Sequence, residues 1–282
     1  MEQAREARPL GVTDHAAPRR PRVSLSRRAA RVAATVVPPL VALALLVVAW
    51  ELWVRERQVA EYLVPRPSAV ADALWSDPGR YATAAQESLV AALGGLVIAS
   101  VGAFALAAVM AHSRWLERAL YPPALMVKVT PIVAVYPLFA IWFGFGVGPK
   151  VAIAALITFF PMLVNALVGL RTVDPAALDF LRAMHASRWQ LFWRLRLPSS
   201  LPYVFAALRI SVPLSLIGAV VAEFLSGSSG MGQLILIANG DFDTPALFGA
   251  IVVLAALGVA LTAGVAYIER RVLFWQESTV GP

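Results

Sequence analysis

Cysteine is absent from this 282-residue chain, and histidine occurs only three times, at His15, His112 and His185. Without thiols there can be no disulfides, thiolate nucleophiles, iron–sulfur clusters or cysteine-bound zinc, and the scattered histidines do not suggest a metal centre. Charge is also scarce, because 15% of the residues are charged while 59% are hydrophobic. A soluble domain of this length rarely holds so large an apolar fraction. We therefore expect a polytopic membrane protein with no cofactor or metal of its own.

The apolar residues are gathered in long runs. A transmembrane helix needs about 20 apolar residues, and six segments are long enough, namely residues 32–53, 88–111, 120–143, 151–170, 203–225 and 246–268. The second run carries Gly95, Ala99 and Gly102 at helical spacing, which predicts a face for close helix packing. The third contains Lys128 and four prolines, so we expect it to be kinked or locally unwound. The predicted fold is all-α with six spans.

The basic residues are divided unevenly between the two sides that six spans create. Seventeen of the 24 Lys and Arg residues share a side with the N-terminus, and five lie on the other side. Cytoplasmic loops are rich in Lys and Arg, so both termini are expected in the cytoplasm and the chain in the cell membrane. Topology thus explains the net charge of +7, and no nucleic-acid partner is expected.

Composition further divides the chain into regions. Residues 1–31, rich in Arg, Ala and Pro, predict a disordered cytoplasmic tail that orients the chain or touches membrane lipid. Residues 32–54 predict a retained anchor helix, because the apolar run is longer than that of a cleaved signal peptide. Residues 84–268 hold the other five spans, and residues 269–282 predict a cytoplasmic C-terminal tail. A short interfacial helix is expected at Pro67–Trp75.

The segment between the fourth and fifth spans, residues 171–202, is long and polar. An unstructured connection of that length is uncommon. Asp174 followed by Pro175 is typical of a helix start, and apolar residues recur at helical spacing before and after the stretch from His185 to Ser187. We expect two short helices with a bend at that stretch. The periodicity alone also fits an amphipathic pair resting on the membrane.

This segment resembles the coupling loop of binding-protein-dependent ABC importer permeases. The family pattern is Glu-Ala-Ala, three residues, Gly, nine residues, a hydrophobic residue, one residue and Leu-Pro. Asp179, Phe180 and Leu181 occupy the Glu-Ala-Ala positions, His185 that of the glycine, and Leu197–Pro198 the closing pair. The spacing is kept while several identities depart, notably at His185, since histidine adopts a positive φ less readily than glycine.

The resemblance extends from about Tyr62 to Trp275 and is closest to the branch that serves nitrate, aliphatic sulfonates, taurine and thiamine-pyrimidine precursors. It is carried by LVPRPSAV at 63–70, TPIVAVYPLFAIWFGFGVGPK at 130–150, FFPMLVNALVGLRTVD at 159–174 and VVAEFLSGSSGMGQLI at 220–235. The stretches LRLPSSLPYVFAALRI and GAVVAEFLSGSSGMG resemble pyrimidine-precursor and riboflavin-type permeases more than sulfonate or nitrate permeases.

The resemblance implies a type I importer core, in which a permease homodimer works with a cytoplasmic ATP-binding subunit and an extracytoplasmic solute-binding protein. This chain lacks the G-x-x-x-x-G-K-[ST] loop that cradles ATP phosphates, so it is expected to be a transport subunit and not an enzyme. GFGVG at 144–148 falls short of a nucleotide loop and predicts a tight turn. The residues expected to couple to the ATP-binding subunit are Asp179, Arg182, His185, Ala186, Ser187, Arg188, Leu197 and Pro198. For Arg182 and Arg188, membrane topology alone is an equal explanation.

Polar side chains within the spans are candidates for the translocation path, because they are costly at membrane depth. Lys128 either faces the path and attracts an anion or snorkels to the interface. Asn165 lies within the fourth span. Glu223 ends the fifth span and is either part of an external gate or a solvated helix end. Arg209, near the start of the fifth span, is expected to snorkel.

Other functions fit the sequence less well. An intramembrane enzyme would need catalytic motifs such as H-E-x-x-H or G-x-S-x-G, and neither is present. The main alternative is an ATP-independent secondary transporter or channel, for which inverted repeats would be typical. Neither that alternative nor a membrane scaffold explains the pattern of residues 171–202.

Overall fold

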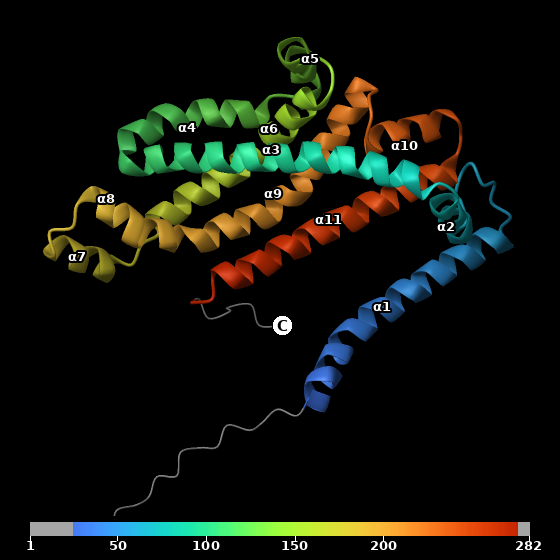
Figure 1. The fold of residues 1–282 in the computed structure, drawn as a ribbon, viewed down its shortest axis with the longest axis horizontal. Helices are drawn as coiled ribbons and strands as arrows, with labels where there is room; N and C mark the ends of the chain where they lie inside the picture. The colour runs from blue at the N-terminus through green and yellow to red at the C-terminus, as the bar shows by residue number, and fades with distance from the viewer. Residues whose placement is uncertain (1–24, 276–282) are drawn as a thin grey trace, which may run out of the picture. The chain divides into compact units, whose positions relative to one another are not determined.

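The computed structural model describes residues 25–275, and the regular structure within that range is entirely helical (Figure 1). The chain separates into two parts, one ending at Leu52 and one starting at Trp53. Most of α1 (Leu25–Glu56) belongs to the first part. Its apolar side chains are exposed, with Leu45 and Leu46 each 64% accessible, as expected for a helix surrounded by lipid.

The predicted N-terminal tail is only partly within the described residues. Residues 1–24 lie outside them, and residues 25–31 belong to α1. The helix therefore begins before the apolar run does. Arginine and alanine are good helix formers, so the helix extends to the N-terminal side of the apolar residues. At the other end of the chain, residues 276–282 of the predicted C-terminal tail lie outside the described residues.

The second part contains the remaining elements. They are α2 (Pro67–Ser76), α3 (Pro78–His112), α4 (Arg114–Val129), α5 (Ile132–Phe143), α6 (Val147–Arg171), α7 (Pro175–Ala183), α8 (Arg188–Leu191), the π-helical turn η1 (Phe192–Arg196), α9 (Leu197–Ser226), α10 (Met231–Gly240) and α11 (Thr244–Val272). A short helix is present where one is predicted at Pro67–Trp75, namely α2. The helices α3, α6 and α9 form the centre of this part, and α6 packs against both of the others.

Small residues bring α3 and α6 together. A Cβ at Gly95 would lie 2.5 Å from Cβ of Ala154 and 2.7 Å from the backbone nitrogen of Ala155, so only glycine fits there. Ala99 and Ala103 continue the same face and are buried. Gly102, predicted to belong to this face, is exposed, because the contact repeats every four residues. In lipid, such close approach replaces the hydrophobic effect as the source of helix association.

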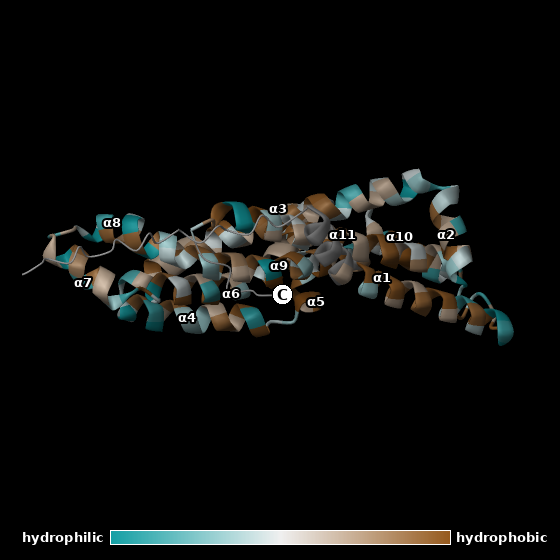
Figure 2. Cartoon of the chain, turned by 90° about the horizontal axis from the view of Figure 1, so that it is seen from below, coloured by the Kyte–Doolittle hydropathy of each residue, from teal (hydrophilic) through white to brown (hydrophobic). Residues whose placement is uncertain are grey.

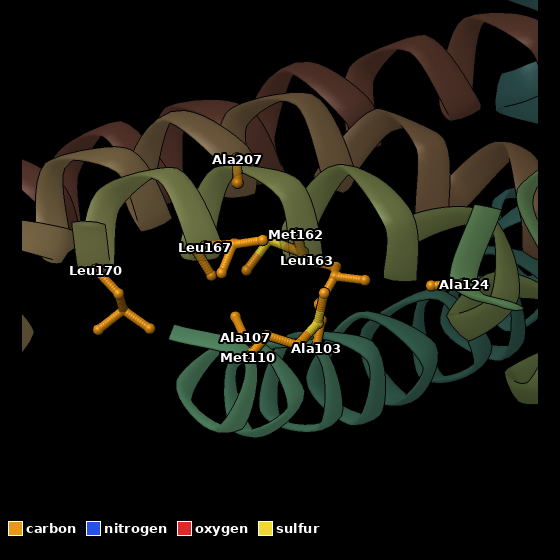
Figure 3. Packing of buried hydrophobic residues seen from close by; sticks show 10 residues of the cluster. Ala103, Ala107, Met110, Ala124, Met162, Leu163, Leu167, Leu170 and Ala207 are labelled. Carbon is orange, nitrogen blue, oxygen red and sulfur yellow. The ribbon is translucent and has the colours of Figure 1, made fainter. Parts of the chain in front are cut away.

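The largest cluster of buried apolar side chains joins α3, α6, α9 and α4. Figure 3 shows Ala107 and Met110 of α3 facing Leu163 and Leu167 of α6, with Ala207 of α9 beyond them. Met110 and Leu163 have no accessible surface. Small alanines on one helix leave room for larger side chains on the next, and such close packing favours van der Waals contact.

The third predicted span is broken rather than merely kinked. Its two halves, α4 and α5, meet at an angle of 100°. The break falls at Thr130 and Pro131, where proline lacks an N–H and disfavours a helical conformation in the residue before it. Within residues 25–275, five helices are long and apolar enough to cross a membrane, or six if the bent pair counts as one span.

Polar residues gather at the ends of these helices. Figure 2 shows hydrophilic residues on α8 and on one end of α4, and hydrophobic residues over α10.

The tight turn predicted at 144–148 is present, since Gly144 and Gly146 have φ values of 75° and 134°. These two glycines end α5 and start α6.

Candidate functional site

The segment 171–202 folds as two helices, as its sequence predicts. Asp174 caps α7 by accepting a hydrogen bond from the backbone N–H of Ala176 at 3.0 Å. Ser187 and Gln190 form a reciprocal capping box at the start of α8, with distances of 3.2 and 2.8 Å. The second helix is not a separate short one, because α8 continues through η1 into α9 as one helix of 39 residues, Arg188–Ser226.

The bend between α7 and α8 depends on His185. This residue adopts φ of +55°, the left-handed conformation that glycine adopts most easily. Its N–H donates to the carbonyl of Arg182 at 2.9 Å, and the N–H of Ala186 donates to that of Leu181 at 3.0 Å. The bend thus keeps the glycine-type backbone although a histidine occupies the position.

Most side chains of α7 and α8 are exposed. Neither helix has a buried residue. Phe180 and Met184, on the predicted apolar face of α7, are 65% and 67% exposed. Asp179 and Arg182 form an exposed ion pair at 3.4 Å, which contributes little to stability. An apolar face that stays uncovered by the part of the chain the structure describes suits a surface that contacts another subunit.

The base of this segment is held more firmly. Trp189, Phe192 and Trp193 pack their rings against one another with centroids 5.4 to 6.2 Å apart. Leu197 and Pro198, predicted to belong to the coupling loop, are the first residues of α9 and are half-buried. The exposed part of the segment is therefore α7, the bend and the start of α8.

A buried polar cluster lies at the opposite end of the bundle. Its buried side chains are Ser88 of α3, Lys150 of α6 and Glu223 of α9, and they are joined by the exposed residue Ser229 and by the first backbone N–H groups of α10. Glu223 has no accessible surface and accepts hydrogen bonds from the hydroxyl of Ser88 at 2.8 and 2.9 Å. The N–H of Gly232 donates to the same carboxylate at 2.8 Å. Glu223 therefore joins α3, α9 and α10, and is not a solvated helix end.

Lys150 completes the cluster from α6. It is 1% exposed, and its ammonium donates to the carbonyl and to the hydroxyl of Ser229, the latter at 3.3 Å. It is also close enough to Glu223 for an electrostatic interaction. A buried lysine needs such partners, because its desolvation is otherwise costly.

Gly230 lets the α9–α10 turn approach the carboxylate. Its φ is +114°, and a Cβ there would lie 2.2 Å from the Oε1 atom of Glu223. The N–H of Met231 donates to the hydroxyl of Ser88 at 2.9 Å. Ser88 thus accepts from α10 while it donates to Glu223, which ties the three helices together.

Most of this cluster was not predicted. Lys150 directly precedes the predicted fourth span, residues 151–170, and is one of the five basic residues counted on the outer side, whereas the structure places it inside α6 and fully enclosed. Ser88 belongs to no motif, and neither Ser88 nor Ser229 carries a charge. The one usable signal was Glu223 beside SGSSGMG, a carboxylate followed by a glycine-rich turn with free N–H groups.

The other polar residues within the spans have partners of their own. Lys128 is exposed, with its ammonium 4.7 Å from the ring centroid of Phe160. Asn165 donates to the carbonyl of Pro161 at 2.9 Å, within its own helix. Arg209, expected to snorkel, pairs with Glu269 of α11 at 2.6 Å. The structure does not bring Lys128 or Asn165 into the buried polar cluster.

Comparison with known proteins identifies the architecture. Residues 95–274 match the family described as the binding-protein-dependent transport system inner membrane component. The chain belongs to this family. The permease is 38% identical to the riboflavin transport system permease protein of Chloroflexus aurantiacus over 84% of its own length and 90% of that protein. It is 33% identical to the formylaminopyrimidine transport permease protein of Halalkalibacterium halodurans, covering 83% and 93%.

Solved structures show the same fold. A chain from inward-facing structures of the MetNI methionine ABC transporter aligns with a TM-score of 0.56 and 18% identity, covering 71% of the permease and 97% of that chain. The permease is thus the membrane subunit of an ATP-driven importer, in the branch predicted from the sequence. Membership of this family disfavours the ATP-independent transporter that the sequence left as the main alternative.

Proposed function

We propose that the permease imports a flat heterocyclic solute of the riboflavin or pyrimidine-precursor class. The support comes from the relatives named for riboflavin and formylaminopyrimidine transport, which match 84% and 83% of the chain. A relative named for aliphatic sulfonate transport, from Bacillus subtilis, is 34% identical but matches only 68% of the chain. Sulfonates, taurine and nitrate are therefore the second class of candidate substrates.

We further propose that α7 and the start of α8 dock into a cytoplasmic ATP-binding subunit, which hydrolyses the ATP. The observation that carries this proposal is the exposed, well-capped segment around the bend at His185. Asp179, Arg182 and Arg188 offer charge to the partner, and Phe180 and Met184 offer the uncovered apolar surface. In this proposal α7 lies in the cytoplasm, and the α9–α10 turn lies on the outer side and faces the solute-binding protein.

The helices on either side of the segment connect the two ends of the bundle. α6 carries Lys150 near its start and Arg171 at its end, while the continuous helix from Arg188 carries Glu223 near its end. At 1.5 Å per residue this continuous helix is about 58 Å long. A movement of α7 therefore tilts α6 and the continuous helix, whose far ends carry the buried polar cluster. Glu223 serves as part of the outer gate.

The transport path of a complete importer is lined by two permease subunits. We propose that this permease forms a homodimer in the membrane. Lys128 and Asn165 remain the candidates for contact with the solute along the path. Lys128 is the stronger candidate, because its exposed charge over the ring of Phe160 offers both a cation and an aromatic face.

The test is transport in liposomes. The permease is reconstituted with its ATP-binding subunit and its solute-binding protein, and uptake of riboflavin, formylaminopyrimidine and taurine is measured. ATP-dependent uptake of a heterocycle and not of taurine is expected. Uptake by the permease alone without ATP contradicts the importer, whereas ATP-dependent uptake of taurine alone contradicts only the substrate class.

A further inference from the structure

A basic pocket of about 500 Å³ lies where α3 ends and α4 begins. Its charged lining consists of Arg114, Arg118, Arg171 and Arg196, with one carboxylate, Glu117. The pocket is distinct from the exposed surface of α7, which extends beyond the α3–α4 turn in Figure 1. Four guanidinium groups around one carboxylate leave a strong excess of positive charge in a concave site.

Two of these arginines already have structural partners. Arg171 pairs with Glu117 at 2.6 Å and donates to the carbonyl of Met110 at 3.1 Å. Arg196 donates to the carbonyl of Ala111 at 3.2 Å. Both therefore cap the end of α3, where carbonyl groups lack helical partners. The carboxylate of Glu117 is thus already paired with Arg171.

The other two arginines are available. Arg114 and Arg118 are exposed, and within residues 25–275 neither has a carboxylate partner. Arg114 is the first residue of α4, a helix of 16 residues, so the positive end of the helix dipole adds to their charge. Guanidinium groups bind phosphate oxygens in pairs of parallel hydrogen bonds. The unsatisfied donors in this pocket thus match a phosphate group.

The position of the pocket points to a lipid as the source of that phosphate. Trp115, next to Arg114, is 74% exposed, and tryptophan is typical of the membrane–water interface. The pocket lies at the ends of apolar helices, where lipid headgroups lie. We infer that it binds the phosphate of an anionic phospholipid headgroup.

The bound lipid would contact segment 171–202 near both of its ends, where it joins α6 and α9. Arg171 is the last residue of α6 before the segment, and Arg196 is the last residue of η1 before α9. A phosphate in contact with these side chains braces the point from which α7 and α8 project. This consequence rests on the proposed coupling role, whereas the binding site itself does not.

The experiment measures lipid retention. The full-length permease is purified in detergent with added phosphatidylglycerol or phosphatidylcholine, and bound lipid is counted by native mass spectrometry. Wild type is expected to retain phosphatidylglycerol selectively, and Arg114→Gln/Arg118→Gln to bind it roughly tenfold more weakly or worse. The control Arg270→Gln/Arg271→Gln removes the same charge from exposed residues at the end of α11 and is expected to bind as wild type does.

A second arm separates the two sources of phosphate. Glycerol 3-phosphate is titrated into the lipid-free permease and its variants. Binding of glycerol 3-phosphate that depends on Arg114 and Arg118, without retention of phosphatidylglycerol, overturns the lipid assignment in favour of a soluble phosphate ester. Equal phosphatidylglycerol retention by both double variants overturns the site itself. Single variants at Arg114 and Arg118 repeat the comparison if the double variant does not fold.

Discussion

Glu223 and Lys150 are enclosed by protein although both belong to long helices of mostly apolar sequence. Each charged group is matched by several hydrogen-bond partners, and the carboxylate alone accepts from Ser88 and Gly232. Breaking such a set leaves a buried charge short of partners, which is strongly destabilising. The cluster is therefore expected to hold the α10 end of the bundle in one defined arrangement.

Replacing Ser88 with alanine tests this arrangement. Glu223 loses its Ser88 donor and the N–H of Met231 loses its acceptor, so we expect a loss of about 1–3 kcal/mol in stability. Thermal unfolding in detergent measures the change. The matched control is Ser100→Ala on the same helix, since the buried Ser100 hydroxyl has no hydrogen-bond partner within residues 25–275 and its removal should be neutral or stabilising. Equal melting temperatures for the two variants would contradict the prediction.

His185 is the second residue whose backbone matters. In the left-handed region a side chain costs about 1–2 kcal/mol relative to glycine, so His185→Gly should stabilise the bend and preserve transport, while His185→Val should weaken both. Met184 has φ of −77°, and Met184→Gly should bring no such gain. Limited proteolysis between α7 and α8 reports the stability of the bend. A faster cut in His185→Gly than in Met184→Gly would show that the conformation is not strained.

At the scale of elements, the fold depends on how closely α3 approaches α6. Gly95→Ala would place a methyl group 2.7 Å from one backbone atom of α6 and 2.8 Å from another. The helices must then separate, and we expect a loss of about 1–3 kcal/mol. Gly264→Ala on α11 meets nothing within 4 Å and should be neutral or slightly stabilising through helix propensity. Thermal unfolding of both variants compares the two positions.

The exposed helix α7 has a different sensitivity. Asp179→Arg removes the weak pair with Arg182 and reverses a charge on the proposed docking face, so insertion and folding should persist. Copurification with the ATP-binding subunit, or ATP-driven uptake, should be lost. Asp72→Arg makes the same exchange on the exposed face of α2 and should leave both intact. Undiminished ATP-driven uptake by Asp179→Arg would exclude α7 as the coupling surface.

At the scale of the whole molecule, the proposed orientation can be read directly because the chain has no native cysteine. A single cysteine at the exposed residue Ala183 of α7 should react with a membrane-impermeant maleimide only after the membrane is opened. A cysteine at Trp75 of α2, 89% exposed, should react in intact cells. The reverse pattern would overturn both the count of basic residues and the proposed site of docking.

Much of the architecture follows from local properties of the sequence. Apolar runs of about 20 residues must become helices in a bilayer, because no other structure satisfies their backbone groups without water. The caps of α7 and α8 depend on Asp174 and Ser187, which act on N–H groups two or three residues away. Such short-range effects are readable from residue order, as are the bend at His185 and the break at Pro131.

Other features depend on which helices meet. Ser88 and Glu223 are 135 residues apart in the sequence, and Lys150 and Ser229 are 79 apart. No local motif spans such distances. Whether α4 and α5 are one span or two, and which face of α3 is buried, likewise depend on contacts across the bundle. The composition and order of residues thus settled the membrane class and the family, and they pointed to residues 171–202 as the proposed coupling segment. Only the packing of α3, α6, α9 and α10 decided that Lys150 is buried and Glu223 enclosed, because the partners that make a buried charge tolerable come from distant parts of the chain.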